Sequence, residues 1–437
     1  MEHHETRPFG FWTACAMVVG GVIGAGIFVM PSQLAPYGWT GVAAWIVGGL
    51  GAVAIGLVLS SVAAARPQEP GLIAVIGEVL GPVWGVLVGW GAWVSYWCAN
   101  AYIALTAARY AGAFWPPLAD TPFHQALTAS AVILALTWLN LHNLRTSGRF
   151  QVVTTVLKLL PLVAVMLILV QLTVADPSAL VRQPHPPFVG AELFTATTLA
   201  YGAIIGFESA AVGAQRVRNP GRNVPRATIA GILLSCLIYL AVSTTIVFTM
   251  PVAEVAASNA PIAMFIGSHW GSGAALAVAG FAVISTVGCL NVWVLLQGEV
   301  PLALARAKLL PDWIGRTNRH DIAAIPMITA SALSVALLFA ASWRNGAAIM
   351  DFMIRLTAVS GIWVYVFACV TALVLGVSRI LAVMGLLVCA GVFYGGGAEP
   401  FVLSVVLSVV ALPLYLLARR GMVRTAGSSA AAAGLPG

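Results

Sequence analysis

Long apolar segments follow one another along almost the whole chain, separated by short polar connections rich in glycine, proline and arginine. A helix needs about 20 consecutive apolar residues to cross a bilayer. The pattern predicts twelve spans, near residues 10–36, 39–65, 82–114, 123–143, 148–173, 189–214, 226–250, 270–300, 324–343, 348–376, 378–396 and 400–418. We therefore predict an all-α membrane protein, because the connections are too short to hold a soluble domain.

The first predicted span contains GVIGAGIF, a run in which glycines weaken the helix. Each glycine costs about 1 kcal/mol relative to alanine in a helix interior. Free backbone groups at membrane depth are tolerated only where they are buried in protein or line a cavity. The run therefore predicts a broken helix at a ligand site, with a breakpoint at Gly24–Gly26. The alternative is a face of small residues for helix packing.

The sixth span contains the matching feature, LAYGAIIGFESAAVGAQ, where Gly202 and Gly206 bracket a stretch that ends in Glu208. Interrupted first and sixth spans are typical of two inverted five-helix repeats that form a central substrate site. We expect these repeats at about 10–173 and 189–376 within a transporter core at 10–376. Residues 1–9 and a disordered tail, 419–437, would be cytoplasmic, and 377–418 would add two helices.

The two predicted breaks differ in the charge that each suits. A half-helix that begins after Gly26 presents free N–H groups and a partial positive charge, which suit a carboxylate. Carbonyl groups freed in the sixth span can accept hydrogen bonds from an ammonium group. The pair therefore indicates a zwitterionic α-amino acid better than a sugar, a lone ion or a nucleotide.

The chain has 437 residues, of which 60% are hydrophobic and 8% charged, with a net charge of +7. Its basic residues do not indicate a nucleic-acid partner, because sixteen of the 21 lysines and arginines fall in one set of connections. The positive-inside rule places that set in the cytoplasm, together with both termini, and only Arg182 and Arg344 outside. MEHHETRPFG has no signal-peptide pattern, so we expect a multi-pass protein of the cytoplasmic membrane.

Catalytic and metal-binding chemistry is not indicated. The six cysteines form no CxxC pair, and HExxH and GxSxG are both absent from the sequence. We therefore expect no enzyme activity, no cofactor and no metal site. A channel is the strongest alternative from another class, but the chain offers neither a repeated filter nor a ring of like charges.

At these motifs the chain resembles the amino acid–polyamine–organocation superfamily, and within it the bacterial arginine/agmatine antiporter group. The resemblance rests on GVIGAGIFVMPSQLA, on GFESAAVGAQRVRNPGRNVPRATIAG and on ALARAKLLPDWIGRTN, in that order along the chain. It implies the inverted-repeat (LeuT-like) fold and alternating-access transport of amino acids or related amines. A homodimer and protons are further candidate partners beside the bilayer and the substrate.

The resemblance also implies a substrate site. The residues that match it are Val22, Ala25, Gly26, Asn100, Gly202, Ile205, Trp293 and Thr357. The backbone at Ala25 and Gly26 would meet the carboxylate, and carbonyls near Val22, Gly202 and Ile205 would hold the amine. Asn100, Trp293 and Thr357 would read the side chain.

Two positions depart from the antiporter group, which has a serine where this chain has Ala25 and a tryptophan where it has Gly202. Loss of the aromatic platform would remove a cation–π contribution of about 0.5–2 kcal/mol and enlarge the pocket. Arginine specificity therefore does not follow from the resemblance.

Lys158, Glu208 and Glu299 are the ionisable residues within predicted spans that most need an explanation, and Glu299, near the cytoplasmic end of the eighth span, is expected to be solvated or paired with an arginine. A charge at the bilayer centre costs at least about 2.5 kcal/mol, so each needs a partner, a cavity or neutrality. Lys158 resembles a fifth-span lysine that takes the place of a sodium ion in related transporters, which favours sodium-independent transport. It is either a fixed positive strut or a coupling residue, and Glu208 either exchanges a proton or anchors the backbone. Exchange and proton symport both stay open.

Overall fold

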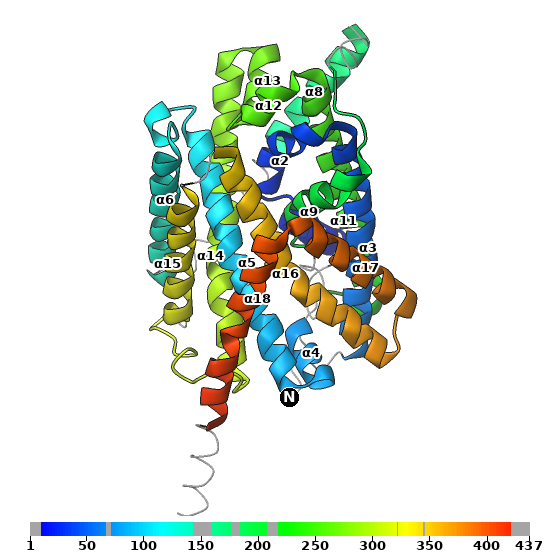
Figure 1. The fold of residues 1–437 in the computed structure, drawn as a ribbon, viewed down its shortest axis with the longest axis vertical. Helices are drawn as coiled ribbons and strands as arrows, with labels where there is room; N and C mark the ends of the chain where they lie inside the picture. Colours follow the sequence, from blue (N-terminus) through cyan, green and yellow to red (C-terminus); the bar gives the residue numbers. More distant parts are fainter. Residues whose placement is uncertain are drawn as a thin grey trace, which may run out of the picture.

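The computed structural model describes residues 10–66, 71–142, 157, 159–175, 184–207, 217–320, 322–343 and 346–420. Helices dominate this part of the chain, and they run mostly along the long axis of the molecule (Figure 1). The predictions for Lys158, for Glu208, for residues 1–9 and for most of the tail lie outside the described residues.

Each of the twelve segments predicted from the hydrophobic pattern contains a described helix. The helices are α1 (Phe11–Val22), α2 (Gly26–Leu34), α3 (Gly38–Ala65), α4 (Leu72–Leu80), α5 (Pro82–Ala111), α6 (Pro122–His142), α8 (Leu159–Ala175), α9 (Leu193–Ile204), α11 (Pro220–Thr249), α12 (Val252–Ala257), α13 (Pro261–Trp270), α14 (Ser272–Arg306), α15 (Ala324–Ala341), α16 (Gly346–Leu375), α17 (Arg379–Gly396) and α18 (Ala398–Val409). Eight helical segments in the described ranges are long and apolar enough to cross a membrane. The all-helical membrane architecture is confirmed at that level, and the count of twelve spans stays a prediction.

Helix α5 lies at the centre of the packing, where it contacts α14 and α16 over much of its length. Helix α3 packs against α9 and α11, while α6 and α15 lie side by side at one flank of the molecule (Figure 1). Small residues on α3 allow the close approach, since a Cβ atom at Gly56 would lie 2.8 Å from Thr228 Cγ2 of α11. Gly56 of α3 thus allows close helix packing. This is the role that was considered as the alternative for the glycines of the first span.

Two short helices that each precede a long predicted span were not predicted from the sequence. Helix α4 joins α5 through Gly81, and α13 joins α14 through Gly271. Both glycines have positive φ angles, 110° and 87°, a conformation that side chains with a Cβ rarely adopt. Helix α4 and the α12–α13 pair lie at opposite ends of the molecule (Figure 1).

Candidate functional site

The first break is present. Helix α1 ends at Val22, α2 begins at Gly26, and the three residues between them are not helical. The Gly24 N–H donates to the Val22 carbonyl at 2.8 Å, which makes a tight turn at the breakpoint. All nine residues of α2 are buried. Because the first N–H groups of a helix have no acceptor within it, the start of α2 is suited to bind a carboxylate.

Helix α9 ends at Ile204, at the place of the second predicted break, and residues 208–216, which would continue this span, lie outside the described residues. The Ile205 N–H still donates to the Tyr201 carbonyl at 3.2 Å, and Gly206 turns the chain with a φ angle of 116°. Gly202 lies inside the last turn of α9, not at the turn itself. The break therefore starts three residues later than the first glycine of the predicted stretch.

The expectation that Gly202 enlarges the pocket is wrong. A Cβ atom there would lie 2.8 Å from Ile354 Cγ2 and 3.2 Å from the Ile354 carbonyl oxygen, so α16 already fills the space. A tryptophan at this position would collide with α16. The absence of the family's aromatic residue is thus matched by the close packing of Ile354.

The two breaks touch each other, and glycine allows the contact on each side. A Cβ atom at Gly26 would lie 2.8 Å from the Ala203 Cβ atom of α9. A Cβ atom at Gly206 would lie 2.5 Å from the Gly21 carbonyl oxygen of α1. Larger residues at either position would separate the α1–α2 break from the end of α9.

Tyr239 of α11, which the sequence reasoning missed, joins the two breaks. Its hydroxyl lies 3.0 Å from the Val22 carbonyl oxygen and 3.1 Å from the Ala203 carbonyl oxygen. The ring stacks on Trp45 of α3, with centroids 4.9 Å apart and an interplanar angle of 23°. The available signal was a tyrosine deep in an apolar span, since a buried O–H needs an acceptor.

The Val22 carbonyl therefore accepts two hydrogen bonds in this conformation, from the Gly24 N–H and from Tyr239. A carbonyl oxygen has two lone pairs, so an incoming ammonium group would have to displace one of these donors. The phenol has only one hydrogen for two carbonyl groups, which makes it the donor that can be displaced at the smaller cost.

The three positions predicted to read the side chain lie on α5 and on two helices that pack against it, α14 and α16. The Trp293 ring packs edge-on against Tyr96 at 5.3 Å. The Thr357 carbonyl accepts a hydrogen bond from Ser95 at 3.1 Å, and its own hydroxyl is buried. Asn100 is fully buried and donates to Gln297. Within the described ranges, Asn100 Oδ1 and Thr357 Oγ1 have no hydrogen-bond partner.

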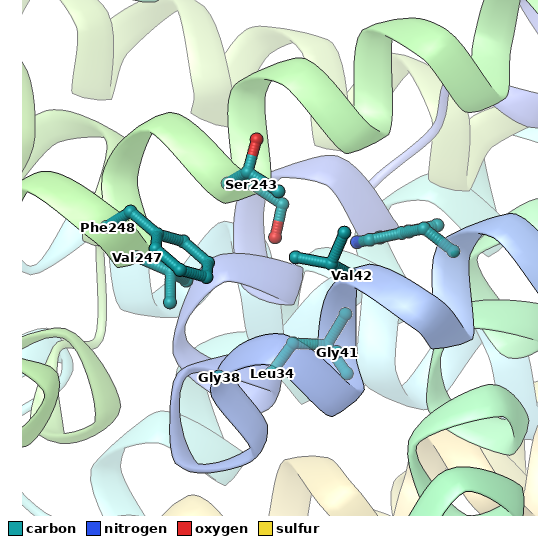
Figure 2. A pocket seen from close by; sticks show the side chains of 9 residues that line it. Leu34, Gly38, Gly41, Val42, Ser243, Val247 and Phe248 are labelled. Carbon is teal, nitrogen blue, oxygen red and sulfur yellow. The ribbon is translucent and has the colours of Figure 1, made fainter. Parts of the chain in front are cut away.

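Neither of two cavities among the described residues offers a substrate-sized space at the breaks. A cavity of about 10 Å³ lies between α2, α3 and α11 (Figure 2), which is room for about one water molecule. Its lining residues are Leu34, Gly38, Gly41, Val42, Trp45, Ser243, Thr244, Val247 and Phe248. A second cavity, about 410 Å³, is lined mainly by α13 and α14 and includes no residue of either break.

Comparisons with known proteins agree with this architecture. The chain is 26% identical to the cadaverine/lysine antiporter of Escherichia coli K12, over 94% of this chain and 95% of that protein. It is 25% identical to the arginine/ornithine antiporter of Pseudomonas aeruginosa, over 74% and 69% of the two chains. The arginine/ornithine antiporter of Latilactobacillus sakei is 23% identical, over 77% and 73%.

The sequence model of one family covers nearly the whole chain, from residue 9 to residue 417. The match includes both breaks and the three helices that carry Asn100, Trp293 and Thr357. The family and the relatives are transporters, so the chain is not expected to be an enzyme, in agreement with the sequence reasoning. The chain belongs to the amino acid permease family, and it is an amino acid transporter.

Proposed function

We propose that the chain exchanges basic amino acids and related amines across the cytoplasmic membrane by alternating access, without sodium. The observation that carries this proposal is the contact between the start of α2, which presents N–H groups at Gly26, and the end of α9, which presents carbonyl groups near Ala203. This arrangement is suited to a zwitterion. The relatives that exchange lysine, cadaverine, arginine or ornithine support the substrate class and the antiport mode.

The order of the helices supports an inverted-repeat fold of twelve spans. In the first half, a broken span, α3, a short α4 and the long α5 follow one another; in the second, α9, α11, the short α12 and α13, and the long α14 do so. The short helices lie at opposite ends of the molecule (Figure 1), as inversion requires. Positive-φ glycines, Gly81 and Gly271, stand at equivalent places. We infer cytoplasmic termini from the distribution of arginine and lysine.

In the proposed complex the backbone at Ala25 and Gly26 binds the carboxylate. Carbonyl groups near Val22, Gly202 and Ile205 bind the amine, which displaces the Tyr239 hydroxyl. Asn100, Trp293 and Thr357 contact the side chain. Lys158 and Glu208 are proposed, from their sequence positions alone, to exclude sodium and to govern coupling.

The test is counterflow in proteoliposomes loaded with a panel of unlabelled amino acids and amines, with and without a pH gradient and with and without sodium. We expect labelled lysine, arginine or ornithine to enter only when a basic substrate is inside, in a saturable and sodium-independent way. If a pH gradient drives uptake into vesicles that contain no internal substrate, the proposed transport mode is wrong and proton symport takes its place.

Lys158→Ala and Glu208→Gln are each expected to reduce exchange severely. Near-normal rates at all pH values in either variant would refute a coupling role for that residue. Single-channel currents through the purified protein would refute a carrier and favour the channel alternative.

A further inference from the structure

A chain of hydrogen bonds runs through buried side chains of four helices, beginning at Asn100 of α5. Asn100 Nδ2 donates to Gln297 Oε1 of α14 at 2.6 Å. Gln297 Nε2 donates to the Met327 carbonyl at 3.1 Å and to Ser331 Oγ of α15 at 2.7 Å. Ser331 Oγ lies 2.7 Å from Thr137 Oγ1 of α6. Every side chain in this series is at least 95% buried.

The direction of each bond follows from the two backbone carbonyls at which the chain ends. The Met327 carbonyl can only accept, so the nitrogen of the Gln297 amide faces it and the oxygen faces Asn100. The Thr137 hydroxyl donates to the Ile133 carbonyl at 2.8 Å, so Ser331 must donate to Thr137. With Gln297 oriented in this way, Asn100 must turn its nitrogen toward Gln297 and its oxygen away.

The oxygen that this arrangement leaves is a buried acceptor without a described donor. Asn100 is fully buried, and Oδ1 has no hydrogen-bond partner within the residues that the structure describes. Buried polar atoms are rarely left unsatisfied, and such atoms in a native structure point to a ligand or a water. Any partner must be a donor, such as an N–H group.

The face of α14 that carries Gln297 also reaches the first break. Cys289, Trp293 and Gln297 are spaced four residues apart, so they line one face of the helix. A Cβ atom at Gly24 would lie 3.1 Å from Cys289 Sγ, which places this end of the face against the break. Trp293 and Gln297 follow at about 6 Å and 12 Å along the axis.

Helices α5 and α14 run antiparallel, since a Cβ atom at Gly89 would lie 2.9 Å from Leu304 Cδ1 while Tyr96 packs on Trp293. Asn100 therefore lies about level with the Trp293 turn. A side chain as long as that of lysine spans the distance from the break to this turn.

We propose that Gln297 is a positioning residue for substrate selection, which rests on the proposed transport function. It holds the Asn100 amide so that Oδ1 accepts an N–H group from the far end of a substrate side chain, while the break binds the α-amino and carboxylate groups. The site therefore selects amino acids with a side-chain donor over apolar ones of equal length, without a carboxylate at this point.

The experiment measures competition by lysine and by norleucine, which has the same carbon chain but no terminal amine, against labelled basic substrate bound to purified protein. Gln297→Leu frees the Asn100 amide to turn. A hydrogen bond to a charged donor corresponds to about 10- to 150-fold in affinity, so we expect lysine binding to fall within this range. Norleucine binding should stay within about twofold.

Asn140→Leu is the matched control, because Asn140 Nδ2 donates to Asn291 Oδ1 at 2.8 Å and joins α6 to α14 by the same kind of amide pair. We expect it to lower thermal stability and to keep the lysine-to-norleucine ratio. Gln297→Glu, which retains the acceptor for Asn100, should restore at least part of the ratio. The proposal is overturned if Gln297→Leu weakens both ligands equally or leaves the ratio unchanged. If wild-type protein exchanges no basic amino acid at all, the proposed function itself fails.

Discussion

The backbone region of the site and its side-chain region are built in different ways. At the breaks, the groups offered to a substrate are N–H groups at the start of α2 and carbonyl groups at the ends of α1 and α9, held together by Tyr239. On α5 and α14, the groups are side chains, and Gln297 fixes the orientation of Asn100. In the proposed site, the backbone region binds any α-amino acid and the side-chain region discriminates between them.

The largest expected effect is in the backbone region. Gly26→Ala would place a Cβ atom 2.8 Å from the Ala203 Cβ atom and push the two breaks apart. We expect exchange of every substrate to fall by at least about 100-fold, as misplaced binding groups do. Gly20→Ala is the matched control, since no described atom lies within 4 Å of a Cβ atom at that position of α1. Similar exchange rates for the two variants would contradict the close contact of the breaks.

Tyr239→Phe removes the donor shared by the Val22 and Ala203 carbonyls. We expect affinities for all substrates to rise by a common factor of about two- to tenfold, because the incoming amine no longer has to displace the phenol from the Val22 carbonyl. Tyr110→Phe provides the baseline. The Tyr110 hydroxyl donates to the Phe28 carbonyl, with a donor–acceptor distance of 2.8 Å, and Phe28 lies inside α2 and not at the breakpoint. Competition curves for a substrate panel decide the matter: a change confined to one substrate would place Tyr239 in the side-chain region instead.

Trp293→Leu should give a smaller and selective effect. Loss of a cation–π contact in the side-chain region is expected to weaken substrates with a cationic side chain by about two- to fivefold. Neutral substrates should change less. Inhibition constants for lysine and norleucine test this directly. An equal change in both constants would mean that Trp293 packs against Tyr96 and does not contact the substrate cation.

The smallest effect is expected outside both regions, at Asp120 in the connection before α6. The hydrogen bond from His124 lowers the pKa of the Asp120 carboxyl. The ionised carboxyl therefore stabilises the fold above the pKa that Asp120 has in the unfolded chain. This stabilisation is lost as the pH falls through the pKa of Asp120 in the folded protein. The pair is solvent-exposed, so Asp120→Asn should leave exchange unchanged and shift the Tm only slightly. A melting curve at neutral and at acidic pH checks this, and a large loss of transport would contradict it.

Much of the fold could be predicted from hydropathy, because a span of apolar residues bounded by charge has one stable arrangement in a bilayer. The first break was placed correctly, since the cluster from Gly20 to Gly26 weakens the helix there. The short helices α4, α12 and α13 were missed because they lie in connections without a full apolar span.

The site was only partly predictable, for reasons of packing. The presence of Ile354 against Gly202 depends on how α16 approaches α9, which no local pattern encodes. Tyr239 bonds the Val22 carbonyl 217 residues away along the chain, and Gln297 bonds Asn100 197 residues away. Gln297 sits in an apolar helix, and a buried amide there was a signal that a polar partner was required.

The separation of the two regions is tested most directly by measuring the lysine-to-norleucine affinity ratio in wild-type protein, in Tyr239→Phe and in Gln297→Leu. We predict a ratio of at least about 10 in wild-type protein and in Tyr239→Phe, although the latter binds both ligands more tightly. In Gln297→Leu the ratio should approach 1. A ratio that falls in Tyr239→Phe, or that persists in Gln297→Leu, would contradict the division between a backbone region that binds and a side-chain region that selects.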